Sequence, residues 1–152
     1  MAYLIDTSIL GRLANSADEF FPVASRAVVE LHRRGEVLHV TPQNLIEFRS
    51  VATRPVNVNG LGLSPSEAEE KAAGFEAAFP LLAETPDIFL LWKTLVGALA
   101  VVGKRVHDAR LVAVCHAHRV SHLLTFNAPH FAQMADIAPG ITIVEPAAVH
   151  AE

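Results

Sequence analysis

The stretch "YLIDTSIL", residues 3–10, runs from apolar residues directly into an aspartate and then into two hydroxyl side chains. It predicts a short buried strand over residues 2–5, followed by a helical turn over residues 8–13. Asp6 is then either the N-cap of that turn, accepting backbone N–H bonds, or part of a functional site. The second interpretation follows from its position, because sites in parallel α/β sheets lie beyond the carboxyl ends of the strands.

Strands and helices alternate along the rest of the chain. Short apolar runs predict strands, while capping residues, glycines and prolines mark the ends of the helices. The expected strands cover residues 37–40, 122–126 and 141–146, and the expected helices cover residues 19–34, 42–53, 65–79, 86–102, 106–120 and 128–134. This order predicts an α/β fold in which helices cover both faces of a central parallel sheet of four to five strands. The length fits a single domain, residues 1–152.

The composition is that of a folded globular protein. Hydrophobic residues make up 51% of the chain and charged residues 18%, which excludes the disordered class. The net charge of −4 excludes a surface that is positive throughout, so binding of nucleic acid would need a local basic face. Candidates for such a face are Arg33, Arg34, Arg49, Arg54, Lys104, Arg105 and Arg110. Solvated helix ends explain the same residues equally well.

The sequence predicts a cytoplasmic protein without a membrane span. The longest nearly uncharged run, residues 88–103, is interrupted by Lys93 and is shorter than the roughly 20 residues that a membrane helix needs. We therefore expect a core helix there. No basic leader precedes the first apolar residues, and Asp6 interrupts them, which is untypical of a signal peptide. A single cysteine, Cys115, suits a reducing compartment.

Two further carboxylates fall where helical spacing predicts a buried face. Glu47 shares a stripe with Asn44, three residues before it, and Val51, four residues after it. Asp108 stands four residues before Val112 on a similar stripe. Asp108 also has a second explanation, because it lies near the start of its helix, where a negative charge is favoured by the helix dipole.

Three carboxylates that point inward need partners, because a buried ionised carboxylate without one is energetically costly. A hard divalent cation such as Mg²⁺ or Mn²⁺ is a suitable partner, since it prefers oxygen ligands. Arginines are the other option, and only Arg49 and Arg110 flank the apolar stripes.

Four motifs, taken together, resemble the PIN-domain ribonucleases, in particular the VapC-type toxins of type II toxin–antitoxin systems. The motifs are "LIDTSIL" (residues 4–10), "TPQNLIEF" (residues 41–48), "GKRVHDARLVAV" (residues 103–114) and "HLLTFNAPHF" (residues 122–131). The resemblance covers nearly the whole chain. Each motif alone is short, and their order and spacing within one domain make the match specific.

The resemblance implies a PIN-like fold and a Mg²⁺- or Mn²⁺-dependent endoribonuclease that hydrolyses phosphodiester bonds in RNA. Asp6, Glu47 and Asp108 match the acidic residues of the family that bind the metal and are catalytic. Thr7 or Ser8 matches the hydroxyl that supports the first of these carboxylates.

Other polar residues complete the expected site. Asn127 stands where the family often has an aspartate, so it is a candidate for a further metal ligand that adds no charge. Asn44, His107, Arg110 and Thr125 are expected to support the carboxylates or to position the substrate. The other explanation for His107 is that it simply lies near the start of its helix and has no role in the site.

The family implies an RNA substrate, a cognate antitoxin protein and a homodimer, with no membrane partner. Two other functions stay open. A degenerate PIN domain would bind RNA or a protein without cleaving, which Asn127 and the negative net charge would suit. A phosphatase of the haloacid-dehalogenase type also begins with a strand-terminal aspartate, but it generally has a second aspartate two residues later, where this chain has Ser8.

Overall fold

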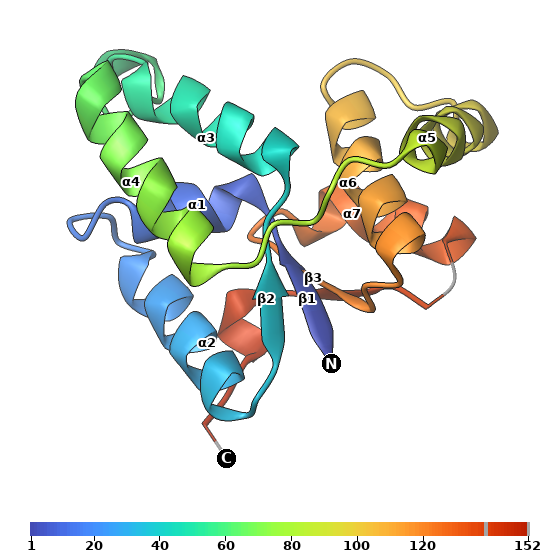
Figure 1. Ribbon diagram of the computed structural model, residues 1–152, viewed down its shortest axis with the longest axis horizontal. Coiled ribbons are helices and arrows are strands. Elements are labelled where there is room, and N and C mark those ends of the chain that lie inside the picture. Colours follow the sequence, from blue (N-terminus) through green and yellow to red (C-terminus); the bar gives the residue numbers. More distant parts are fainter. Residues whose placement is uncertain (139, 152) are drawn as a thin grey trace.

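Four parallel strands form the central sheet, and seven helices surround it in the part of the chain that the structure describes (Figure 1). This computed structural model describes residues 1–138 and 140–151. The strands are β1 (Ala2–Ile5), β2 (Val37–His39), β3 (His122–Leu124) and β4 (Thr142–Val144). The helices are α1 (Thr7–Leu13), α2 (Phe21–Arg33), α3 (Pro42–Thr53), α4 (Pro65–Ala78), α5 (Pro86–Leu99), α6 (Arg105–His118) and α7 (Ala128–Ile137), with 3-10 turns at Val56–Val58 and Pro146–Ala148.

Strand β1 lies inside the sheet, whose order is β2-β1-β3-β4. Tyr3 is in register with Leu38 of β2 and His122 of β3, and every strand pair is parallel. The predicted α/β fold is therefore confirmed, with four strands. Since parallel strands point the same way, their carboxyl ends share one edge, and Asp6 lies there. Its N–H donates to the carbonyl oxygen of Leu124 at 2.9 Å, which joins it to the end of β3.

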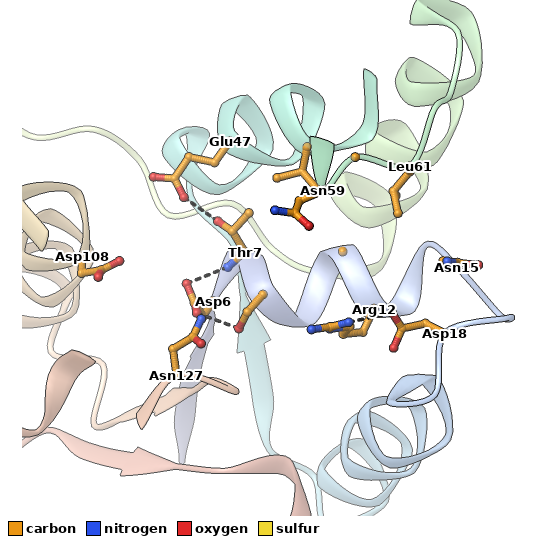
Figure 2. Close-up of a pocket in the computed structure, with 14 residues that line it drawn as sticks. Asp6, Thr7, Arg12, Asn15, Asp18, Glu47, Asn59, Leu61, Asp108 and Asn127 are labelled. Atoms are coloured by element: carbon orange, nitrogen blue, oxygen red, sulfur yellow. Dashed lines mark hydrogen bonds and ion pairs between the residues drawn. The ribbon is translucent and has the colours of Figure 1, made fainter. Parts of the chain in front are cut away.

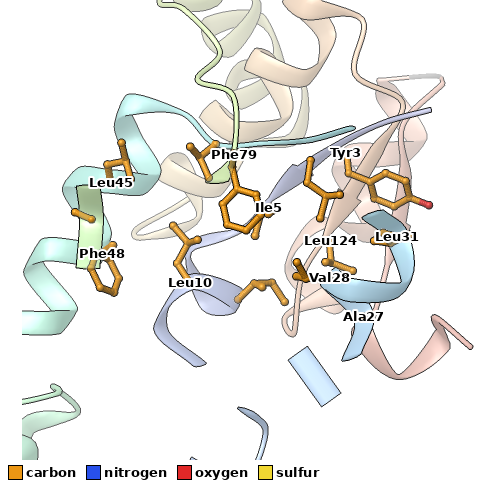
Figure 3. Packing of buried hydrophobic residues seen from close by; sticks show 14 of the residues in the cluster. Tyr3, Ile5, Leu10, Ala27, Val28, Leu31, Leu45, Phe48, Phe79 and Leu124 are labelled. Atoms are coloured by element: carbon orange, nitrogen blue, oxygen red, sulfur yellow. The ribbon is translucent and has the colours of Figure 1, made fainter. Parts of the chain in front are cut away.

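Alternate side chains of β1 enter two separate cores, because successive residues of a strand point to opposite faces. Tyr3 and Ile5 pack with α1, α2, α3 and α4, while Leu4 packs with α5, α6 and α7. Helices accordingly cover both faces of the sheet, as expected (Figure 1). Figure 3 shows the first core, in which Ile5, Leu10 and Phe48 belong to one buried cluster.

Capping boxes begin α3 and α4 where the sequence predicts a helix start. The hydroxyl of Thr41 accepts the N–H of Asn44 at 3.0 Å, and Oδ1 of Asn44 accepts the N–H of Thr41 at 3.0 Å. Ser64 and Glu67 make the same exchange at α4. A proline follows each cap, where its missing N–H costs nothing. The start of α3, which carries Glu47, is therefore set by local interactions.

Several elements end earlier than the sequence predicts. The helix expected to reach residue 102 ends at Leu99, because Ala100 takes a left-handed conformation with a φ of 49°. The last two expected strands end two residues early, at Leu124 and Val144, because the residues that follow turn toward α7 and toward the final 3-10 turn.

Helix α5 is not the core helix that its apolar sequence predicts. Only Ile88 and Leu95 are buried, while Phe89 and Leu90 are 60% and 62% exposed. The helix packs on α6 and α7, and its outer side faces solvent. Among the described residues, no helix combines the length and the apolar character that crossing a membrane requires.

The cap of α3 gives a first prediction. Thr41→Ala should lower the free energy of unfolding by about 1–2 kcal/mol, because α3 loses its N-cap and the buried Asn44 loses a donor. Chemical denaturation measures this change. Thr94→Ala, on the exposed side of α5, is the control and should change stability by less than about 0.5 kcal/mol. Equal losses in the two variants would show that the cap has no special role.

Candidate active site

Asp6 is the N-cap of α1, and its side chain also lies among the polar residues at the carboxyl edge of the sheet. Its Oδ1 accepts the N–H of Thr7 at 2.8 Å, as a cap does. Its Oδ2 accepts hydrogen bonds from the hydroxyls of Ser8 at 2.8 Å and Thr125 at 2.7 Å. The two interpretations of this residue are therefore compatible, because cap and edge use different oxygens.

Burial makes the charge of Asp6 costly. The residue is 5% exposed, and its desolvation raises the pKa of the carboxyl group above the ordinary value. The bonds from Thr125 and Ser8 act in the opposite direction, whereas the nearby charge of Glu47 raises the pKa further.

Glu47 is half-buried in α3 and is held through both of its oxygens. The hydroxyl of Thr7 donates to Oε2 at 2.7 Å, and Nε2 of Gln43 donates to Oε1 at 2.7 Å. Asn44 in turn donates to the hydroxyl oxygen of Thr7 at 3.1 Å. The first residue of α1 and the first turns of α3 thus set the position of this carboxylate.

Gln43 is a site residue that the sequence reasoning missed. Besides Glu47, its Nε2 reaches the backbone carbonyl of His107 at 2.8 Å, and its Oε1 accepts from Arg110 at 3.2 Å. The available signal was its spacing, since Gln43 lies one turn before Glu47 on the same helix face. Through this amide, α3 is joined to α6.

Asp108 lies in the first turn of α6, partly exposed. Nη1 of Arg105 is 3.5 Å from its Oδ2, and Nδ1 of His130 is 3.7 Å from the same oxygen. Desolvation raises the pKa of the Asp108 carboxyl to about 6, and the negative charge of Asp6 adds to this effect against the opposing Arg105. The charges of the other acidic residues of the site therefore act on the carboxyl group of Asp108.

One pocket of about 540 Å³ contains all three carboxylates (Figure 2). Its lining consists of Asp6, Thr7, Ser8, Gly11, Arg12, Asn15, Asp18, Glu47, Val51, Asn59, Gly60, Leu61, Asp108 and Asn127. Figure 2 shows Asp6, Glu47 and Asp108 around the beginning of α1, contributed by the end of β1, by α3 and by α6. Residues far apart in sequence thus meet at the carboxyl edge of the sheet.

The remaining predicted residues divide into two groups. The hydroxyl of Thr125 donates to the carboxylate of Asp6. Asn127 lines the pocket, and its N–H donates to the hydroxyl oxygen of Thr125 at 2.9 Å. His107 contributes its backbone carbonyl, and its side chain is exposed. Arg110 forms an ion pair with Glu84 at 2.6 Å and lies outside the pocket lining.

The sequence matches the PIN domain family over residues 3–137. This chain belongs to the PIN-domain family. The match leaves the haloacid-dehalogenase alternative without support. Among curated proteins, no sequence matches the chain.

Solved structures share this PIN fold at low sequence identity. VapBC2 from Rickettsia felis, bound to a DNA fragment from its promoter, is 14% identical over 95% of this chain and 98% of that chain, with a TM-score of 0.71. VapBC-1 from nontypeable Haemophilus influenzae is 16% identical over 96% and 98%, with a TM-score of 0.69. VapC20 from Mycobacterium tuberculosis, a toxin that cleaves the sarcin–ricin loop, is 20% identical over 86% and 94%, with a TM-score of 0.62. These similarities confirm the predicted PIN-like fold.

The donor chemistry of the PIN-domain pocket fits a hard divalent cation. Its lining includes carboxylate oxygens from the end of β1, from α3 and from α6, and it also includes Asn127, whose amide oxygen is a further possible ligand. The charge of Glu47 raises the pKa of the Asp6 carboxyl group, and the charges of Asp6 and Glu47 raise that of Asp108, so a cation would relieve this repulsion. Among the described residues, no three His, Cys, Asp or Glu side chains stand close enough together to hold a metal ion. Binding would therefore require the side chains to approach one another.

The raised pKa of Asp108 predicts a pH-dependent cost in metal-free protein. Its folded pKa of about 6 lies above the ordinary value of 3.8, so stability falls as pH rises between the two. In EDTA, Asp108→Asn should be more stable than the original chain by about 1 kcal/mol at about pH 7.5, after allowance for solvent screening. The difference should shrink toward about pH 4, where the carboxyl group of Asp108 is protonated in the folded chain and roughly half protonated in the unfolded chain.

Urea denaturation at the two pH values measures this effect. Asp136→Asn, at an exposed position of α7, is the matched control and should show no such gain. A loss of stability in Asp108→Asn at the higher pH would mean that the charge of Asp108 is favourable in the fold.

Proposed function

We propose that this chain is a Mg²⁺- or Mn²⁺-dependent endoribonuclease and acts as the toxin of a toxin–antitoxin pair, with residues 1–152 working as one domain in the cytoplasm. The observation that carries the proposal is the meeting of Asp6, Glu47 and Asp108 in one pocket at the carboxyl edge of a PIN-domain sheet. Carboxylates that hold a divalent ion are suited to the hydrolysis of phosphodiester bonds.

The carboxylates would hold the ion, with Asn127 as a further oxygen donor. When bound, a divalent ion supplies an activated water and positive charge for the phosphate. Ser8 and Thr125 orient the carboxylate of Asp6, and Thr7 orients that of Glu47. These hydrogen bonds hold the oxygens without adding positive charge that would compete with a cation.

Positive charge for the RNA backbone is supplied beside the acidic residues. Arg105 lies against Asp108 and is 44% exposed, so it can reach a phosphate group. Arg110 is engaged by Glu84 and Gln43 and acts on Glu47 through Gln43. We therefore assign phosphate positioning to Arg105 and a supporting role to Arg110.

RNA, an antitoxin and a second copy of the chain are the proposed partners. Family membership supports the nuclease activity, and the likeness to VapBC structures supports an antitoxin. The exposed apolar residues Phe89 and Leu90 of α5 supply surface for a protein interface. The substrate is expected to be single-stranded or loop RNA, because a compact acidic pocket cannot read the deep groove of an A-form duplex.

The second candidate is a PIN domain that binds RNA or a protein without cleaving. Two observations favour it: Asn127 in place of an acidic residue, and the spacing of the described acidic side chains, which stand too far apart to hold a metal as they are. A cleavage assay separates the two functions.

Asp6→Asn should lower the rate of RNA cleavage by about 100-fold or more, since it removes a charge from the metal-binding set. The fold should persist, because the hydroxyls of Ser8 and Thr125 can turn to accept from the new amide. A fluorescently labelled single-stranded RNA with Mg²⁺ or Mn²⁺ gives the readout. Asp136→Asn serves as the control and should cleave like the original chain. No cleavage by any of these proteins would favour the binding-only function.

Mn²⁺ should raise the melting temperature of the original chain by several degrees at concentrations well above its dissociation constant. The rise should vanish in Asp108→Asn, because the ion loses one carboxylate. Asp136→Asn, which alters an exposed carboxylate outside the pocket lining, should keep the full rise. Differential scanning fluorimetry suffices for this comparison. Equal shifts in all three proteins would place metal binding elsewhere.

A further inference from the structure

The pocket continues along α1 beyond the acidic residues. This second part, which we name the α1 wing, is lined by Gly11, Arg12, Asn15, Asp18, Asn59, Gly60 and Leu61. Figure 2 shows Asn59 and Leu61 above α1, with Arg12 and Asn15 farther along the chain from the carboxylates. A ligand held at the beginning of α1 can therefore extend into the wing without leaving the pocket.

The pocket is larger than a metal site needs. Its volume of about 540 Å³ falls within the range of about 300–1,000 Å³ in which small organic ligands bind. The α1 wing therefore leaves room beside a metal for a group such as a single nucleotide.

Arg12 is held in place at the wing by three neighbours. Its guanidinium carbon lies 5.0 Å from the ring centre of Phe20 and 5.9 Å from that of Phe126, and its Nη1 donates to Asp18 at 2.7 Å. Among the described residues, Nη1 is the only guanidinium nitrogen of Arg12 with a hydrogen-bond partner. Arg12 is also the only lysine or arginine in the described lining of the pocket. A planar cation fixed in this way is suited to a phosphate.

The outer wall of the wing is rigid. A Cβ atom on Gly60 would lie 2.0 Å from the carbonyl oxygen of Arg54, so the two backbone segments touch. The N–H of Gly60 also donates to the carbonyl of Pro55, and the N–H of Leu61 to that of Val51. This packing holds Asn59 beside the pocket in a left-handed conformation with a φ of 61°. Its amide supplies a donor and an acceptor for the polar edge of a base.

Gly11 leaves open space on the α1 side of the wing. No heavy atom lies within 4 Å of the place where its Cβ would be, although glycine weakens a helix by about 1 kcal/mol relative to alanine. The missing side chain keeps the passage between the carboxylates and Arg12 clear. Gly11 is one helical turn from Thr7, a separation that one nucleotide of an extended strand can span.

We propose that the α1 wing binds one unpaired ribonucleotide of the substrate, next to the bond that is cut. Arg12 donates to the phosphate of this nucleotide, and Asn15 and Asn59 bond the polar edge of its base. The assignment rests on the proposed nuclease function and adds to it a requirement for a nucleotide outside a duplex at the cleavage position. It also explains why a glycine occupies the middle of α1.

Binding of RNA in EDTA tests the wing apart from catalysis. Fluorescence anisotropy with an unstructured, fluorescein-labelled RNA should show about tenfold weaker binding by Gly11→Leu, because the leucine occupies the wing. Arg12→Gln should weaken binding to a similar extent, by about tenfold, through the loss of a charged hydrogen bond. A blunt duplex of the same sequence should bind the original chain more weakly than the single strand does.

Gly74→Leu is the matched control. Gly74 is an exposed glycine of α4 that also has no heavy atom within 4 Å of its Cβ position, and it lies outside the pocket lining. Leucine favours a helix over glycine, so both leucine variants should melt at or above the temperature of the original chain. If Gly11→Leu fails to fold, the RNA affinities of Arg12→Gln and Arg12→Lys are compared instead. Arg12→Lys should then bind RNA more tightly than Arg12→Gln and more weakly than the original chain.

The outcomes separate this proposal from the nuclease assignment. If the original chain cleaves RNA and Gly11→Leu retains its KM, kcat and RNA affinity, the wing is refuted and the nuclease function stands. If the original chain does not cleave but Gly11→Leu still loses RNA affinity, the wing stands as a nucleotide site of a binding domain. Equal affinity for single strand and duplex would also overturn the proposal.

Discussion

The buried carboxylate of Asp6 is the constraint on which the arrangement of the site depends. It ends the inner strand β1 and caps α1, and its N–H joins it to the end of β3. A charge in this position must be compensated, and three donors from Thr7, Ser8 and Thr125 surround its oxygens. These same bonds fix where β1 ends, where α1 begins and how the chain leaves β3.

Two further carboxylates are held around Asp6 by elements that belong to opposite faces of the sheet. Glu47 comes from α3, which packs in one core, and Asp108 comes from α6, which packs in the other. Gln43 bridges them by bonding Glu47 and the backbone beside Asp108. The pocket therefore exists only when both cores are formed. The repulsion between its like charges lowers the stability of the fold, and the packing of the rest of the chain offsets this loss.

Local signals in the sequence account for much of the fold. Thr41 and Ser64, each followed by proline, correctly predict the starts of α3 and α4, because a capping box is made within one helical turn. By contrast, the apolar run at residues 88–103 predicted a core helix, and this prediction is wrong. Helix α5 ends at Leu99 and exposes much of its apolar surface. Hydrophobicity indicates that a segment avoids water, but it does not say whether a core or another molecule covers it.

By itself the sequence determined the order of strands and helices, the parallel sheet and the strand-terminal position of Asp6, since these depend on local patterns and on the handedness and reach of the chain. Only the tertiary structure decided which polar residues line the pocket and which support it. Gln43 joins the site and the guanidinium of Arg110 turns to Glu84, because contacts between α3, α6 and the segment before α5 depend on packing. Likewise Gly11 and Arg12 border the same pocket as the carboxylates because α1 runs along it, which no spacing in the sequence reveals.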